Sequence, residues 1–138
     1  MMSLAEKAVT SVYKTNEVLR RHAAPIFESE GISAQQYDVL RVLRGAGGHG
    51  LPAQELGARM LQNTPGVTRL LDRLESKGFV TRRRPDIDRR LQLCSITTAG
   101  TELLESLDPR ARKNARDFLS VLSKDEVQTL MQLLQRTW

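Results

Sequence analysis

The chain has 138 residues, of which 40% are hydrophobic and 27% are charged, and its formal net charge is +5. This length suits one domain with a hydrophobic core, and the composition is typical of a globular rather than a disordered protein. No run of about 18 apolar residues is present, so we expect no transmembrane helix. The first 21 residues lack the apolar block of a signal peptide, and the single cysteine, Cys94, cannot form an internal disulfide. We therefore expect a protein of the reducing cytoplasm, without a membrane partner.

The basic charge is concentrated in the middle third of the sequence. Residues 53–97 carry 9 basic and 5 acidic side chains, a net charge of +4, whereas residues 1–52 carry 6 and 5 and residues 98–138 carry 6 and 6. Five arginines fall within positions 82–90. A localised basic excess favours a partner that presents phosphates, although a solvated charged face is the usual explanation of such a run.

Helical periodicity and capping residues predict the first two helices. Apolar residues recur on one face over about 4–29, with Ser3 as the N-cap and Pro25 placed to kink the helix late. Ser33 followed by Gln36 resembles a capping box and predicts the start of a second helix. We expect that helix to end before the glycine-rich segment 45–50.

Two short helices are expected next. The first covers about 53–60, with Leu56 and Met60 directed inward, and a turn at 61–63 follows it. The second covers about 65–77, with Thr64 as the N-cap and Pro65 at the first helical position. Its apolar face follows the helical spacing i, i+3, i+4, i+7 and consists of Val67, Leu70, Leu71 and Leu74.

A hairpin and two more helices complete the predicted fold. Gly78 is expected to end the fourth helix, and strands over 79–84 and 91–97 enclose a tip at 84–90. A long helix starts at Thr98, and Ser123 with Glu126 forms another capping box before the last helix. The fold class is therefore mainly α with a small β-hairpin wing, which is the pattern of a winged helix-turn-helix.

The second helix of such a pair enters the DNA major groove by its first turns. Arginine can bond guanine with both of its terminal nitrogens, and threonine can contact phosphate or the thymine methyl group. The alternative is that Arg69 and Arg73 pair with Asp72 and Glu75 on a solvated surface. The candidate DNA-binding residues on this helix are Thr64, Gly66, Thr68, Arg69 and Arg73.

The arginines of the hairpin suit phosphates and the minor groove. A narrow minor groove has an enhanced negative potential that attracts inserted arginine. We expect Arg82, Arg83 and Arg84 to line the phosphates, with Arg89 or Arg90 at the tip. Asp88 repels phosphate, so its expected role is to hold an arginine side chain by a bidentate pair. The alternative is a solvated hairpin with an internal Asp–Arg network.

These residues together resemble the MarR family of bacterial transcriptional regulators over nearly the full length. The resemblance rests on VTRLLDRLESKGFV at 67–80 and RRRPDIDRRLQLCSITTAG at 82–100. Asp88, Arg89 and Arg90 match the core of the family's wing, whereas Pro85 stands where that wing usually has its first Asp and Ile87 where some members have a basic residue. The resemblance leaves open which arginine enters the minor groove.

The resemblance implies a homodimer that binds a pseudo-palindromic double-stranded operator, most commonly as a repressor. It implies that residues 33–100 form the DNA-binding region, and that residues 1–30 and 101–138 form the dimerisation helices. Apolar residues near the C-terminus, including Trp138, agree with this assignment, although they can equally cap the core of a monomer.

The resemblance also implies a small aromatic or phenolic effector bound between the dimerisation and DNA-binding regions. The candidate residues for such a site are His22, Ile26, Tyr37 and Arg41, with Arg44 nearby. The alternatives are a surface or dimer-facing His22 and a core Tyr37. No metal or cofactor is expected.

Three further alternatives depend on single features. Cys94 lies on the second strand and is expected to be a small buried hydrophobic residue rather than an oxidant sensor, because a sensor needs exposure and a lowered pKa.

The two histidines, His22 and His49, lie far apart in the sequence, and no phosphate loop or nucleophile motif accompanies them, which argues against an enzyme. A winged helix used only for protein contact is expected to have an apolar wing, and this wing is rich in arginine.

Overall fold

The computed structural model describes residues 1–61 and 66–138. Within those residues it contains six α-helices and three short strands. In chain order they are α1 (Leu4–Glu28), α2 (Ala34–Ala46), β1 (Leu51–Pro52), α3 (Ala53–Arg59), α4 (Val67–Ser76), β2 (Val80–Arg83), β3 (Leu93–Ile96), α5 (Thr98–Phe118) and α6 (Lys124–Gln135). The mainly helical fold with a small β wing is as the sequence predicts.

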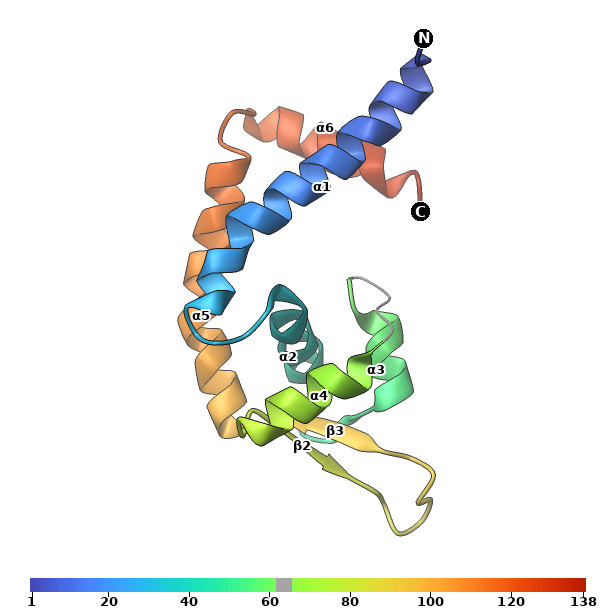
Figure 1. The fold of residues 1–138 in the computed structure, drawn as a ribbon, viewed down its shortest axis with the longest axis vertical. Coiled ribbons are helices and arrows are strands. Elements are labelled where there is room, and N and C mark those ends of the chain that lie inside the picture. The colour runs from blue at the N-terminus through green and yellow to red at the C-terminus, as the bar shows by residue number, and fades with distance from the viewer. Residues whose placement is uncertain (62–65) are drawn as a thin grey trace.

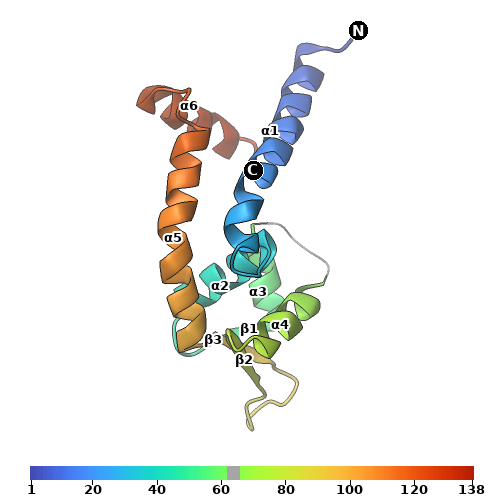
Figure 2. The same ribbon diagram turned by 60° about the vertical axis from the view of Figure 1, so that its left-hand side comes forward.

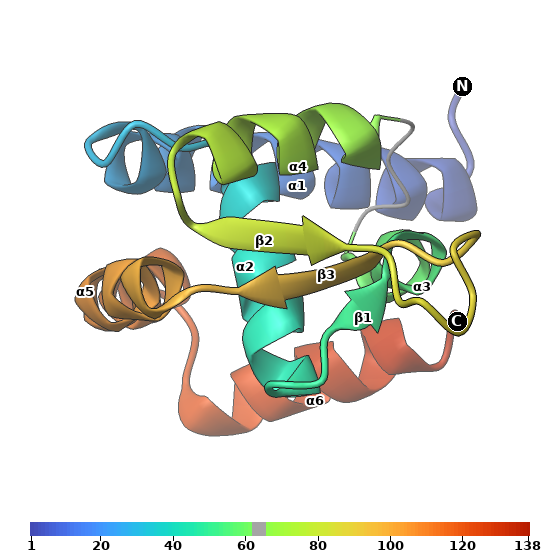
Figure 3. The same cartoon turned by 90° about the horizontal axis from the view of Figure 1, so that it is seen from below.

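The two long helices, α1 and α5, pack side by side, and at the end of the molecule away from the strands they lie with α6 (Figures 1 and 2). At the other end α2, α3, α4 and the strands form the winged part, and the loop between β2 and β3 projects away from it. Seen from below, α4 lies along one side of the β2–β3 pair, and α2 passes behind the strands (Figure 3). α4 and the wing therefore lie beside each other at this end of the molecule.

Helix starts agree with the capping residues of the sequence. Ser3, Ser33 and Ser123 each accept a hydrogen bond from the backbone N–H three residues later, and each forms a complete capping box. The end of α2 differs from the prediction, because the helix continues through Gly45 and Ala46 before it stops. Gly47, with φ 73°, ends it, so two residues of the glycine-rich segment remain helical.

The start of α4 lies partly outside the described residues. The predicted N-cap Thr64, the following Pro65 and most of the turn at 61–63 belong to that gap. The described helix begins at Val67 with Gly66 before it at φ 108°. Leu71 and Leu74 on its inner face are fully buried, as their spacing predicts.

The end of α4 turns the chain directly into the wing. Gly78, with φ 80°, donates its N–H to the carbonyl of Glu75, and the N–H of Phe79 reaches the carbonyl of Leu74. This pair of bonds is the Schellman arrangement, and it needs a residue that adopts positive φ without strain. Since Val80 begins β2 two residues later, the angle between α4 and the wing is fixed locally.

The sheet has one strand that the sequence analysis missed. The order is β1–β3–β2, with Leu51 opposite Cys94 and Arg82 opposite Cys94 on the other side. A two-residue strand ending at Pro52 shows no alternation, so periodicity gives no signal for it. β2 and β3 are also shorter than predicted, because residues at both ends of each predicted strand lie outside the ladder.

One hydrophobic core lies between α2, α4, α5 and the sheet. Its fully buried members include Leu40, Leu43, Leu56, Leu71, Leu74, Val80, Cys94, Leu104 and Leu107. α5 continues through Pro109 as one helix and packs against both α1 and α2. It therefore joins the two ends of the molecule.

The last helix contributes nothing to this core. None of the residues of α6, all of which are described, is buried. Its apolar residues Leu130, Met131, Leu133 and Leu134 are exposed. Within residues 1–61 and 66–138, no helix is long and apolar enough to cross a membrane.

Candidate nucleic-acid interface

The outer face of α4 presents the polar residues that the sequence predicts. Thr68, Arg69 and Arg73 are exposed, and Gly66 is exposed immediately before the helix. The predicted contact Thr64 lies outside the described residues. Among the described side chains, neither Arg69 nor Arg73 pairs with a carboxylate. The alternative in which Asp72 and Glu75 neutralise them is therefore not the arrangement of this structure.

The carboxylates of α4 pair with Arg82 of β2 instead. Arg82 Nη2 donates to Asp72 Oδ1 at 2.6 Å and to Glu75 Oε1 at 2.9 Å, and its Nε lies 3.3 Å from Glu75 Oε2. The Arg82 side chain is only 14% exposed. We call these three residues the Arg82 cluster. The hydrogen bonds to Glu75 and then to Asp72 raise the pKa of Arg82, and the hydrogen bond from Arg82 lowers the pKa of Glu75.

The sequence-based prediction placed Arg82 with Arg83 and Arg84 against the phosphates and did not anticipate this pairing with Asp72 and Glu75. The physical reason is strand alternation: Arg82 is two residues after the buried Val80, so it points to the same side of β2 and under α4. Arg83 points the other way and is exposed. The alternation of the strand was the signal that identifies the buried arginine.

The wing tip contains two ion pairs. Asp88 Oδ1 accepts from both the backbone N–H of Arg90 at 3.0 Å and its Nε at 3.1 Å, and Oδ2 lies 3.4 Å from Nη2. Arg89 Nη1 lies 3.4 Å from Asp86 Oδ1, a pair that fits the alternative of an internal Asp–Arg network. The side chain of Arg90 is 93% exposed, so Asp88 orients it while leaving it accessible.

Arg84 closes the tip from the other strand. Its Nη1 donates to the backbone carbonyl of Arg89 at 2.9 Å. Ile87 lies between the two ion pairs and is completely exposed. The tip therefore combines an internal Asp–Arg network with arginines that remain on the surface.

The expected effector residues take part in helix packing. Tyr37 stacks on Phe27, with ring centroids 4.5 Å apart, and its hydroxyl donates to Asp108 at 2.8 Å. Arg44 Nη1 donates to the other Asp108 oxygen at 2.6 Å. Burial, followed by the hydrogen bond to Asp108, raises the pKa of Tyr37 to about 12. Burial alone raises the pKa of Asp108, but the bonds from Arg44 and Tyr37 outweigh it and the net pKa is lowered.

The other expected residues surround this group. Arg41 lies over the Tyr37 ring at 5.9 Å. His22 Nδ1 lies 2.6 Å from Asn114 Oδ1, and its ring meets Phe118 edge-on. Ile26 is partly buried against the core. These contacts join α1 and α2 to α5.

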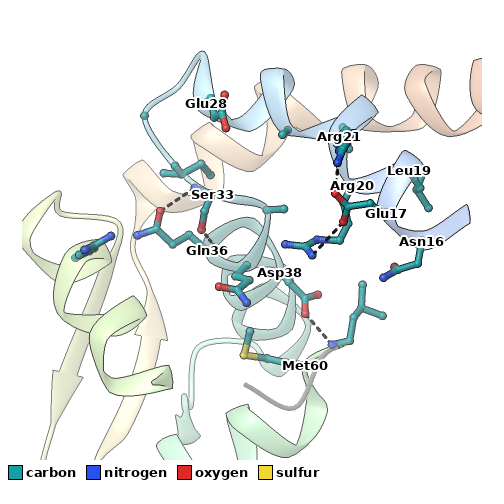
Figure 4. A pocket seen from close by; sticks show the side chains of 18 residues that line it. Asn16, Glu17, Leu19, Arg20, Arg21, Glu28, Ser33, Gln36, Asp38 and Met60 are labelled. Atoms are coloured by element: carbon teal, nitrogen blue, oxygen red, sulfur yellow. Dashed lines mark hydrogen bonds and ion pairs between the residues drawn. The ribbon is translucent and has the colours of Figure 1, made fainter. Parts of the chain in front are cut away.

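A cavity of about 830 Å³ lies on another side of α1 and α2, and none of His22, Ile26, Tyr37 or Arg41 lines it. Figure 4 shows Arg20 and Arg21 reaching toward it from α1 and Gln36 and Asp38 from α2, with Met60 below. Asp38 is buried and accepts a hydrogen bond from the backbone N–H of Leu61 at 2.8 Å. The cavity depends on how α1 crosses α2, which residue periodicity does not reveal.

Cys94 is fully buried in the core. Burial raises the pKa of its thiol. Both observations favour the packing role over an oxidant sensor, because thiolate formation is suppressed and access is closed.

Comparisons with known proteins point to one family. A model of the MarR family matches residues 30–91. The HTH-type transcriptional regulator PecS of Dickeya dadantii is 30% identical over 130 residues, which cover 93% of this chain and 78% of that protein. A crystal structure of a MarR transcription factor from Planctomyces limnophilus is 32% identical, aligns over 98% of both chains and has a TM-score of 0.77.

The chain belongs to the MarR family. MarR proteins are DNA-binding transcriptional regulators, and repressors are among the relatives of this chain. The protein is therefore a transcriptional regulator and not an enzyme. A mutant MarR of E. coli complexed with operator DNA is 27% identical, covers 99% of each chain and has a TM-score of 0.85.

Proposed function

We propose that the protein is a homodimeric, ligand-responsive repressor that binds a pseudo-palindromic operator through α4 and the wing. The observation that carries this proposal is the set of exposed arginines on α4 and the wing. These are Arg69 and Arg73 on α4, and Arg83, Arg84, Arg89 and Arg90 on the wing. We also propose that the protein is cytoplasmic, because a bacterial transcriptional regulator has to reach the chromosome.

The first turns of α4 are proposed to enter the major groove. Arg69 and Arg73 are four residues apart on one side of the helix, and both guanidinium groups are accessible. Arg69 is the nearer to the helix start and is assigned to base edges, where arginine bonds guanine O6 and N7. Gly66 and Thr68 are assigned to the phosphate or thymine contacts of the same turn, and the contact expected from the sequence at Thr64 lies outside the described residues.

The wing is proposed to follow the backbone into the minor groove. Arg90 is the arginine that Asp88 orients, so we assign the groove contact to Arg90 and a supporting phosphate contact to Arg89. Arg84 braces the tip through the Arg89 carbonyl and adds positive charge there. Arg82 is omitted from these contacts because its guanidinium is occupied by Asp72 and Glu75.

The dimer proposal rests on the apolar surfaces of α1 and α6. The exposed residues of α6 include four large hydrophobics on a helix that buries nothing, and Trp138 beyond it is also exposed. Val9, Val12, Tyr13 and Val18 are exposed on α1. Apolar surface of this extent marks an interaction site, and two half-sites about 10 base pairs apart require two copies of the recognition helix.

The effector is proposed to bind in the cavity between α1 and α2, because the residues predicted from the sequence are engaged in helix packing. Its lining combines Arg20, Arg21 and Arg73 with the apolar Leu19, Ile32 and Met60. Three acidic residues, Glu17, Glu28 and Asp38, also line it, and Glu17 pairs with Arg20 and Arg21, so Arg73 is, among the described lining residues, the arginine left for an anionic group. That combination suits an aromatic or phenolic acid, which has a flat apolar ring and an anionic group. Since Arg73 belongs to α4, a ligand there can favour an arrangement of α4 that does not fit DNA.

The test is a selection of genomic fragments by the purified protein, followed by binding isotherms over a salt series. We expect a shared inverted repeat and an affinity that falls steeply with salt. Absence of an enriched site together with salt-independent binding would exclude DNA recognition and favour a protein partner for the winged part. Hydroxybenzoic acids are then titrated into the protein–operator complex, and release of DNA is expected if the cavity is an effector site.

Replacing the minor-groove arginine provides the matched test. Arg90→Ala is expected to weaken operator binding at least about tenfold while leaving the fold intact, because one inserted arginine is lost from each wing. Arg112→Ala removes the same charge from the exposed side of α5 and serves as the control. Equal affinity of the two variants would remove Arg90 from the contact set.

A further inference from the structure

The recognition helix carries two carboxylates close to the side chains proposed to touch DNA. Asp72 lies three residues after Arg69 and four after Thr68, so these residues are neighbours on one helical face. Glu75 lies one turn further, and its side chain and that of Asp72 are 42% and 56% exposed. An unpaired carboxylate at this place repels the phosphates that α4 has to approach.

Within the Arg82 cluster, the guanidinium group of Arg82 neutralises both carboxylates. Arg82 reaches both carboxylates with charge-assisted hydrogen bonds and is itself only 14% exposed. Its backbone belongs to β2, where it pairs with Cys94 of β3. The guanidinium is therefore supplied by the wing and received by the recognition helix.

Arg83, the next residue of the same strand, provides a comparison, because its side chain is accessible to a DNA partner. The side chain of Arg83 is exposed on the outer side of β2, and that of Arg82 is enclosed under α4. For Arg82 to reach a phosphate, it has to break its bonds to Asp72 and Glu75 and leave both unpaired beside the DNA. That exchange gains one favourable contact and creates two unfavourable ones.

We propose that Arg82 is a positioning residue for DNA binding: it neutralises Asp72 and Glu75 and ties α4 to the wing, and it does not touch the DNA. This inference rests on the proposed function, because it assumes that α4 binds DNA. Arg82 acts through the two carboxylates, so its importance for affinity depends on their charge. A phosphate-contacting arginine has no such dependence.

The test is a double-mutant cycle on operator affinity. Arg82→Gln is made in the wild-type chain and in a chain that already carries Asp72→Asn and Glu75→Gln. In the wild-type background we expect affinity to fall at least about tenfold, because two uncompensated carboxylates face phosphates. In the amide background the same substitution is expected to cost less than about threefold, because no negative charge remains to be neutralised.

The outcomes separate this inference from the proposed function. If wild-type protein binds no specific DNA, the proposed function is wrong, and that result does not depend on the Arg82 variants. If wild-type protein binds but Arg82→Gln has the same effect in both backgrounds, whether large or absent, the positioning role is wrong. Arg83→Gln in both backgrounds is the control, since an exposed arginine on the same strand is expected to show equal effects. Thermal unfolding of every variant establishes that an affinity loss does not come from unfolded protein.

Discussion

At Gly100 the structure gives a direct steric reason why a larger side chain should destabilise the protein. It lies in the first turn of α5, where a β-carbon would fall against the Phe79 carbonyl oxygen and 2.7 Å from Ile96 Cγ1. The Phe79 carbonyl also accepts the N–H of Thr97, so neither it nor the helix start can move away freely. Gly100→Ala is expected to lower the free energy of unfolding by about 1 to 3 kcal/mol, as overpacking does. Denaturant unfolding measures this.

Gly45 provides the matched control for that substitution. It is also helical, but a β-carbon there meets nothing within 4 Å. Gly45→Ala is expected to leave stability unchanged or to raise it by up to about 1 kcal/mol, because alanine loses less backbone entropy. Similar losses in both variants would show that the close approach at Gly100 is not the cause.

Because of Tyr37, the free energy of unfolding is expected to depend on pH in the alkaline range. Its pKa in the folded state is about 12, against an ordinary value of 10.0, first because of burial and second because it donates to Asp108. The folded state keeps the proton that the unfolded state releases, so the stabilising contribution is complete below pH 10 and is lost as pH rises toward 12. The loss is expected to be on the order of 2 kcal/mol.

The measurement compares wild-type protein with Tyr37→Phe across this pH range. Below pH 10 the variant is expected to be the less stable, because it leaves Asp108 without one hydrogen-bond donor. The difference between the two proteins is expected to shrink as the tyrosine titrates. A difference that stays constant from pH 10 to 12 would contradict the raised pKa.

Among the elements, the wing tip shows how a carboxylate can favour DNA binding. Asp88 orients Arg90 through Nε, Nη2 and the backbone N–H. Asp88→Asn is expected to weaken operator binding about tenfold, because a mobile arginine loses more entropy when it enters the groove. Stability is expected to change by less than about 1 kcal/mol, since the pair is near the surface. Operator isotherms and thermal unfolding give the two values.

Asp86→Asn supplies the control for this effect. Asp86 is 97% exposed and pairs with Arg89 at 3.4 Å, so it holds its partner weakly. Removing its charge is expected to leave affinity unchanged or to increase it slightly, because repulsion of phosphate is relieved. If Asp88→Asn also increases affinity, then repulsion outweighs orientation at both positions and Asp88 does not position Arg90.

The elements that the sequence predicts best are those with a local physical signal. The three serine capping boxes, the buried face of α4 and the glycine that ends it are all determined within a few residues. β1 was missed because its two residues gain their structure from pairing with β3, which is distant in sequence. The pairing of Arg82 with Asp72 and Glu75 was not predicted from the run of like charges, although alternation from Val80 places Arg82 on the inner side of β2. The cavity depends on a helix crossing that no local pattern contains.

At the scale of the whole molecule, α6 presents an apolar face that the rest of the described chain leaves uncovered. It buries none of its residues, and its large apolar side chains face solvent. Leu130→Asp combined with Leu134→Asp is expected to weaken self-association by more than about a hundredfold, because two leucines lose their burial and two charges are desolvated. Sedimentation equilibrium measures the change in mass, and operator affinity is expected to fall with it.

A substitution at the wing tests whether this effect is specific to α6. Ile87→Asp places a charge on an equally apolar and completely exposed residue remote from the terminal helices. It is expected to leave the mass of the assembly unchanged. If the leucine variants keep the same mass as wild-type protein, the apolar face of α6 is not the dimer interface.

The burial of Cys94 makes the chain convenient for spectroscopy. It is the only cysteine of the sequence, and it is enclosed by the core, so thiol reagents have no accessible native target in the folded protein. Ile87→Cys would introduce one reactive thiol at the point of each wing without a second, cysteine-removing substitution. A pair of spin labels attached there reports the separation of the two wings in a dimer. The distance between the labels can then be compared in the presence of operator and in the presence of effector.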